Sequence, residues 1–164
     1  MEISSGASNV AVFIDSDNVS SDLLSKAWSH ISSLGRISIA RAYGDWNSNQ
    51  LVKMGKIAEQ NNIEKRHQES YVSGKNATDI ALSIDVVDSY YKEGYEIAVI
   101  ISGDSDFTPL VDMLKMKNVV VFGVGPIRAS DAFKNACDQY FCINYLAEGE
   151  NEFKDGPFDE ILSA

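Results

Sequence analysis

The stretch Val-Ala-Val-Phe-Ile-Asp-Ser-Asp-Asn, positions 10–18, decides the fold. Its first five residues are apolar and the sixth is Asp15, which is typical of a buried parallel strand that ends at the edge of a sheet. A second expected strand, 96–101, is apolar from Ile97 onward and leads into Ser-Gly-Asp-Ser-Asp at 102–106. Ligands of parallel α/β sheets bind beyond the carboxyl ends of the strands. If the two strands are neighbours, their polar ends therefore form one crevice.

Around these strands the chain alternates predicted strands and helices, with no internal repeat. Further strands are expected at 36–43, 63–66, 119–124 and 139–144, and helices at about 21–34, 51–60, 78–92, 107–116 and 130–136. Right-handed crossovers between parallel strands place helices on both faces of such a sheet. We therefore predict an α/β fold, a three-layer sandwich around a mostly parallel sheet.

Composition sets the class and the domain boundaries. The chain has 164 residues, 45% hydrophobic and 23% charged, which is ordinary for a globular protein. We expect one domain at 10–146, a flexible N-terminus at 1–9 and an acidic C-terminal tail at 147–164. No apolar run approaches the ~20 residues of a membrane span. The polar N-terminus is unlike a signal peptide, so the expected location is the cytoplasm.

Charge and cysteine content exclude several kinds of site. The net charge of −10 argues against a protein that coats nucleic acid through bulk positive charge. Only the stretch 36–75 is basic, with seven cationic side chains against four acidic ones. Cys137 and Cys142 lack the spacing of a zinc or redox motif. The acidic strand ends thus remain the main candidate for chemistry.

Carboxylates that share a crevice repel one another, so such a cluster persists when a cation neutralises it. Oxygen ligands without His or Cys favour Mg²⁺ or Mn²⁺ over zinc. The alternative is that Asp15 and Asp104 only cap the helices that follow them, because Asp is a preferred N-cap residue.

The helix expected at 78–92 supplies a third acid. On a helical wheel Asp79 lies inside a broad apolar arc, whereas Asp85 and Asp88 lie on the opposite face, which we predict to be wet. Asp79 is therefore the better site candidate. Candidate substrate-binding residues are Lys75 in the preceding loop, as the cation beside the acids, together with Asn18 and Ser102, which offer neutral oxygens.

At these positions the sequence resembles the NYN domain family of PIN-like nucleases, and in particular its LabA-like branch. The matching pieces are Phe13 to Asn18, Gly74 to Leu82 followed by Asp85, and Ile101 to Phe107. The resemblance spans about Val10 to Tyr145. The piece Ile-Ser-Gly-Asp-Ser-Asp-Phe, followed by Pro109 and Leu110, is the most specific of the three.

The resemblance implies a strand order of 3-2-1-4-5, which places the first and fourth strands side by side. It implies that Asp15, Asp79, Asp104 and Asp106 are the catalytic, metal-binding acids, with Asn18 as a polar companion. The implied activity is a metal-dependent ribonuclease using Mg²⁺ or Mn²⁺. We expect single-stranded RNA as the partner, because a strand-end crevice admits one backbone more easily than a duplex.

Other functions stay open at this point. Asp15-Ser16-Asp17-Asn18-Val19 is similar to the signature of haloacid-dehalogenase-like phosphatases, in which Asp15 would be the nucleophile and Asp17 the general acid. A non-catalytic PIN-like interaction module is a third reading. The sequence leaves self-association into a homo-oligomer open.

Overall fold

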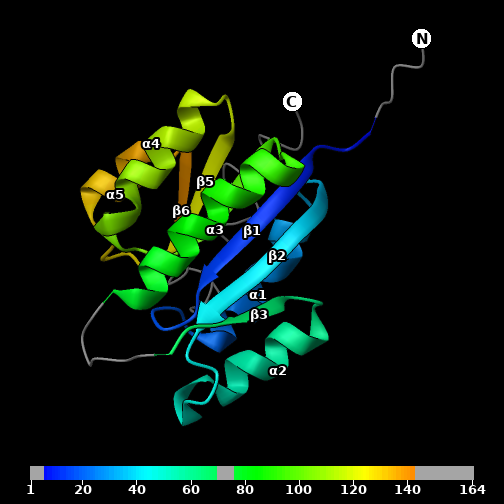
Figure 1. Cartoon of the computed structure of the whole chain (residues 1–164), viewed down its shortest axis with the longest axis vertical. Helices are drawn as coiled ribbons and strands as arrows, with labels where there is room; N and C mark the ends of the chain where they lie inside the picture. Colours follow the sequence, from blue (N-terminus) through cyan, green and yellow to red (C-terminus); the bar gives the residue numbers. More distant parts are fainter. Residues whose placement is uncertain (1–5, 70–75, 143–164) are drawn as a thin grey trace.

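A six-stranded parallel sheet with helices on both faces makes up the described part of this computed structural model, residues 6–69 and 76–142 (Figure 1). The strand order is β3-β2-β1-β4-β5-β6. The predicted three-layer α/β fold and the order 3-2-1-4-5 are confirmed, and β6 extends the sheet beyond β5. The predicted tail, 147–164, and the loop residue Lys75 lie outside the described residues.

The element bounds agree with the predicted ranges to within a few residues. The strands are β1 (Asn9–Asp15), β2 (Arg36–Gly44), β3 (Glu64–His67), β4 (Ile97–Ile101), β5 (Val120–Gly125) and β6 (Gln139–Cys142). The helices are α1 (Ser21–Ser32), α2 (Val52–Gln60), α3 (Ala77–Glu93), α4 (Thr108–Met116) and α5 (Asp131–Ala136), with 3₁₀ turns η1 (Asn49–Leu51) and η2 (Ser105–Phe107). None of these helices has the length and apolar content needed to span a bilayer.

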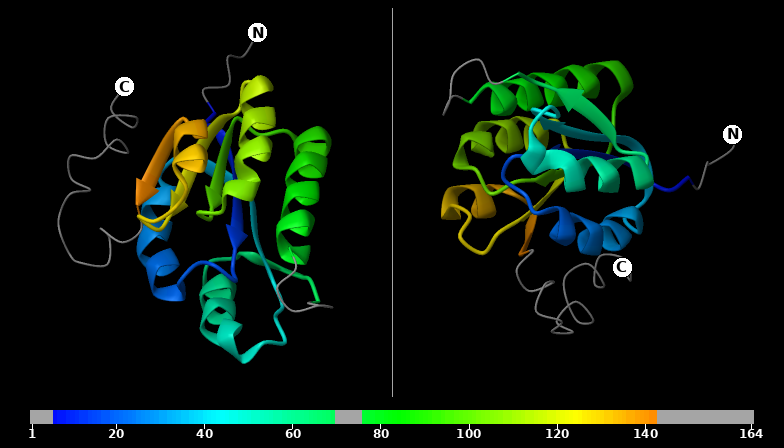
Figure 2. Two further views of the ribbon diagram at one scale, coloured as in Figure 1. Left: turned by 90° about the vertical axis from the view of Figure 1, so that its left-hand side faces the viewer. Right: turned by 90° about the horizontal axis from the view of Figure 1, so that it is seen from below.

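Alternation along β1 divides the interior into two cores. Val10, Val12 and Ile14 pack with α1 and α2, whereas Ala11 and Phe13 pack with α3 and α4. All of these β1 side chains are fully buried. Figure 2 shows α3 and α1 on opposite sides of β1. A strand buried on both faces needs an almost continuous apolar run, which explains the sequence of β1.

The same alternation places the polar side chains at the ends of β1 and β4 on one face of the sheet. Asp15 has the parity of Phe13, and Ser102 has the parity of Ile100, so both point toward the layer of α3 and α4. β1 and β4 are hydrogen-bonded neighbours, with Ile14 paired to Ile101. The expectation that the two polar strand ends meet is therefore confirmed.

The sheet-facing side of α3 differs from the predicted one. Leu82, Val86 and Ser89 are its buried residues, while the side chains of Ile80, Ile84 and Tyr91 are 59%, 64% and 66% exposed. The apolar arc on the helical wheel is thus wider than the face of α3 that contacts the sheet. The centre of the arc is rotated away from that face. Because of this rotation, residues that lie outside the predicted apolar arc face β2.

Asp85 is one of them, and its predicted wet position is wrong. Its carboxylate lies 3.2 Å from Arg41 Nη1 and accepts a hydrogen bond from the Tyr43 hydroxyl. The Arg41 and Asp85 side chains are only 14% and 20% exposed. A half-buried acid is tolerated here because β2 supplies a cation and a hydroxyl donor. Asp88 is exposed, as predicted, and pairs with Lys92.

The Asp85 contacts fix α3 against β2. Burial raises the pKa of Tyr43, and the Asp85 carboxylate raises it further, so the phenol keeps its proton and remains a donor. Arg41 also lies 3.1 Å from Glu64 Oε2 on β3. One arginine therefore ties two strands of the sheet to the helix that carries Asp79.

We expect Asp85→Asn to lower the free energy of unfolding by about 1.5–3 kcal/mol, because it removes a carboxylate that accepts charge-assisted hydrogen bonds. The control is Asp88→Asn on the same helix, whose exposed pair with Lys92 contributes about 0.5 kcal/mol or less. Urea unfolding of the two variants and the wild type measures both values. Equal losses in the two variants would show that the Arg41 pairing does not fix α3.

Candidate metal centre

The junction of β1 and β4 is closed by hydrogen bonds to one oxygen of Asp15. Asp15 Oδ2 accepts from Asn18 Nδ2 at 2.8 Å and from Ser102 Oγ at 3.0 Å. The Ser102 hydroxyl also accepts from the backbone N–H of Asp104 at 3.2 Å. Asp15 and Ser102 are both fully buried. The two strand ends are thus joined through a single carboxylate.

The other oxygen of Asp15 is buried and unsatisfied. Oδ1 has no hydrogen-bond partner within the described residues. Burial raises the pKa of Asp15, and the nearby carboxylates of Asp17 and Asp104 raise it further, against the lowering effect of the bonds from Asn18 and Ser102. A buried carboxylate oxygen without a partner is costly unless a proton or a cation compensates it. Oδ1 of Asp15 is therefore a candidate ligand for a cation.

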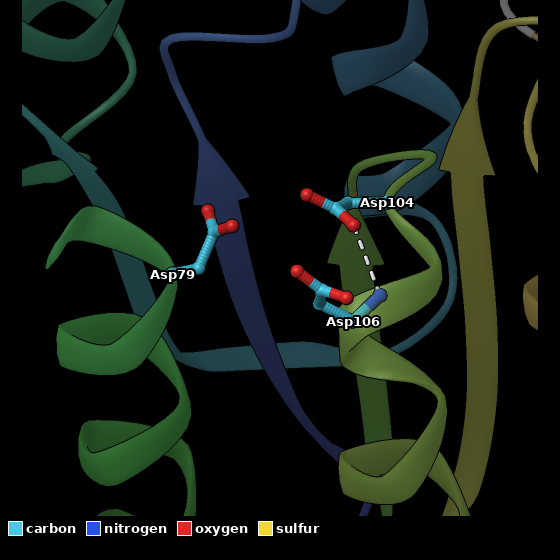
Figure 3. A group of neighbouring side chains, drawn as sticks. All are labelled: Asp79, Asp104 and Asp106. Carbon is cyan, nitrogen blue, oxygen red and sulfur yellow. Dashed lines mark hydrogen bonds between the residues drawn. The ribbon is translucent and has the colours of Figure 1, made fainter. Parts of the chain in front are cut away.

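Three more carboxylates converge beside this junction (Figure 3). Asp79 projects from the first turn of α3, and Asp104 and Asp106 face it from the segment that joins β4 to α4. One carboxylate oxygen from each of the three lies within 4.8 Å of the others. Such spacing allows all three to share one cation.

Local hydrogen bonds hold the second and third acids in place. Asp104 Oδ1 accepts from the backbone N–H of Asp106 at 2.9 Å, which makes Asp104 the N-cap of η2. Asp106 Oδ2 accepts from Asn76 Nδ2 at 3.2 Å. The capping role considered for Asp104 is therefore real and coexists with the cluster. Asp15 caps no helix, because the N-cap of α1 is Ser20.

Burial and crowding by other carboxylates act together on Asp79. Burial and the carboxylates of Asp15, Asp104 and Asp106 raise the pKa of Asp79 from its ordinary value of 3.8 to about 7. Near neutral pH this carboxyl holds a proton for part of the time, which limits the net charge of the cluster. A cation would replace that proton, since both relieve the same repulsion.

The donor set fits a hard divalent cation. All four acids offer carboxylate oxygens, and no His or Cys belongs to the three-acid group. Mg²⁺ and Mn²⁺ prefer such oxygen ligands. Of the predicted site residues, the structure brings together Asp79, Asp104 and Asp106, places Asp15 at the adjoining strand junction, and binds Asn18 and Ser102 to Asp15.

Two small cavities flank the acids. One, of about 240 Å³, is lined by Asn76, Asp79, Ile80, Ser83, Ile84, Asp106 and Phe107. The other, of about 250 Å³, is lined by Asn18, Gly103, Asp104, Pro126, Arg128 and Ala129. Sequence reasoning did not single out Arg128. The available signal was its place just after β5, at the same edge of the sheet as the acids.

Comparison with known proteins identifies the family. A model of the NYN domain matches residues 9–144. The chain belongs to the NYN domain family. No curated protein matches this NYN domain.

A solved structure supports the fold of this NYN domain. This chain is similar to the crystal structure of a Vibrio parahaemolyticus protein of unknown function, with a TM-score of 0.73 and 19% identity. The match covers 87% of this chain and 96% of the other. At this identity the likeness concerns the fold alone. Family membership marks the domain as PIN-like and of nuclease type, which disfavours the phosphatase reading.

In EDTA, we expect the wild type to lose stability relative to Asp79→Asn as the pH rises. The folded-state pKa of Asp79, about 7, exceeds its ordinary value of 3.8. Its favourable contribution is therefore complete below about pH 4 and is lost as the pH rises through about 7. Urea unfolding at about pH 4, 6 and 8 measures the difference between the two proteins.

Asp112→Asn, on the exposed side of α4, is the matched control and should run parallel to the wild type. A difference between the wild type and Asp79→Asn that stays constant with pH would contradict the raised pKa.

Proposed function

We propose that this NYN domain is a metal-dependent endoribonuclease that cuts single-stranded RNA. One observation carries the proposal: three carboxylates each place an oxygen within 4.8 Å of the others, beside a buried Asp15 that has an oxygen without a partner among the described residues. Family membership supports a nuclease, and the chemistry of the donors supports Mg²⁺ or Mn²⁺. The LabA-like branch, which rests on the sequence motifs, is part of the proposal.

The residues of the site have two roles: four acids would bind the ion, and their neighbours orient these acids. Asp15, Asp79, Asp104 and Asp106 would hold the ion, which when bound supplies an activated water and stabilises the leaving oxygen. Asn18 and Ser102 orient Asp15 through its Oδ2. The backbone N–H of Asp106 orients Asp104. Burial and the other three carboxylates raise the pKa of Asp79 to about 7, and Asp79 would give up its proton to an ion because a bound cation favours the charged carboxylate.

The surroundings of the acids favour a single strand. The flanking cavities, about 240 and 250 Å³, are small and lie on either side of the carboxylates. The chain carries a net charge of −10, so bulk attraction to a duplex is absent. Recognition must then depend on contacts made close to the cut. A flexible single strand can bring one phosphate to the acids and its neighbours into these cavities.

The test is cleavage of mixed single-stranded RNA in Mn²⁺. We expect Asp15→Asn and Asp104→Asn to reduce the rate at least ~100-fold, because each removes a ligand that helps to stabilise the transition-state charge. Asp17→Asn is the matched control: its side chain is exposed, it sits in the same turn as Asp15, and it should retain activity. Gel analysis of end-labelled RNA measures the rates.

Three results would contradict the proposal in different ways. Turnover of a phosphomonoester that Asp17→Asn abolishes, with RNA left intact, would support the phosphatase reading. Binding of Mn²⁺ without cleavage of any RNA would support a non-catalytic module. Equal activity of Asp104→Asn and the wild type would remove the acids from the mechanism.

A further inference from the structure

The cavity beside Asp104 has a cationic wall. It measures about 250 Å³ and lies where the segments that follow β1, β4 and β5 meet. Asn18, Asp104 and Arg128 are its polar lining residues, one from each segment. Sites that enclose a whole small molecule are usually larger, about 300–1,000 Å³. This cavity therefore suits one part of a polymer better than a complete ligand.

The wall that carries Arg128 is fixed by close packing. A Cβ at Gly103 would lie 2.9 Å from Ala129 Cβ and 3.0 Å from Pro126 Cδ, so only glycine allows this approach. The Pro126 carbonyl accepts from the Tyr140 hydroxyl at 2.7 Å and from the Ala129 N–H at 3.1 Å. The turn at 126–129 is thus held against the loop that carries Asp104.

Arg128 has no partner within residues 6–69 and 76–142. Its side chain is exposed, and among the described residues no acid or carbonyl pairs with its guanidinium. Among the described residues, it is also the only cationic side chain that lines either cavity beside the acids. The cavity on the other side presents Ile80, Ile84 and Phe107 instead. The described linings on the two sides of the cluster therefore differ in charge.

We propose that Arg128 binds a backbone phosphate of the RNA, one adjacent to the phosphate that is cut. This inference rests on the proposed function. When the scissile phosphate lies at the acids, the next phosphate of the strand must lie on one flank or the other. A guanidinium binds a phosphate through paired, charge-assisted hydrogen bonds. Among the described residues, only the flank with Arg128 offers such a contact, so we expect a second phosphate on that side of the cut to strengthen binding.

The first test measures binding without cleavage. Fluorescence anisotropy with a single-stranded 2′-O-methyl RNA in Ca²⁺ gives affinity as a function of salt. Loss of one phosphate contact should reduce the slope of log affinity against log salt by about 0.7 in Arg128→Gln. Arg128→Lys keeps the charge and should keep the slope. Arg36→Gln makes the same charge change at the amino end of β2, whereas the acids lie at the carboxyl ends of the strands. This variant should also leave the slope unchanged.

The second test uses short substrates in Mn²⁺. A dinucleotide with one internal phosphate is compared with the same dinucleotide carrying an extra phosphate at either its 5′ or its 3′ end. We expect one of the two extra phosphates to raise kcat/KM for the wild type, and Arg128→Gln to lose that gain while keeping the rate on the bare dinucleotide. Arg36→Gln should keep the gain.

The outcomes separate this inference from the proposed function. A slope that Arg128→Gln leaves unchanged, a slope that Arg36→Gln lowers equally, or no binding by the wild type overturns the role of Arg128. Cleavage of RNA by the wild type would still leave the nuclease assignment standing in those cases. A reduced slope without any cleavage supports Arg128 as an RNA contact and rejects the nuclease.

Discussion

Repulsion among carboxylates gathered at one sheet edge is the constraint on which the rest of this structure depends. The parallel pairing of β1 with β4 brings Asp15 beside the Asp104 loop, and α3 adds Asp79 to the same space. Water would screen such charges, but here Asp15 is fully buried and the pKa of Asp79 is raised to about 7. A fold that keeps these acids together must either hold a proton or bind a cation. The proposed nuclease activity requires the second choice.

The scaffold around the acids resists their separation. Arg41 and Tyr43 on β2 donate hydrogen bonds to Asp85 on α3. These bonds keep Asp79 facing the strand ends although the other acids repel Asp79. Ser102 links Asp15 to the Asp104 backbone. These contacts lie beside the cluster rather than within it. They explain how the fold keeps these carboxylates together although they repel one another.

The sequence predicted the parts of this arrangement that depend on local pattern. The apolar run of β1 and its acidic end were visible without a structure, because a strand buried on both faces has little alternative. The adjacency of β1 and β4 came from the family resemblance, since periodicity does not set strand order. The position of Asp85 was missed because its partner, Arg41, lies 44 residues away on another strand, and because exposed Ile80, Ile84 and Tyr91 shifted the apolar arc. Arg128 was missed because a single loop arginine has no pattern around it.

Titration with Mn²⁺ by calorimetry tests the central claim most directly, because it measures whether the acids share a cation without depending on any substrate. The account predicts binding that Asp15→Asn and Asp104→Asn each weaken at least about tenfold, or ~1.4 kcal/mol. The exposed carboxylate of Asp112 lies on α4, away from the cluster, and Asp112→Asn should bind as the wild type does. An affinity for Mn²⁺ that is the same in all four proteins would contradict the shared metal site.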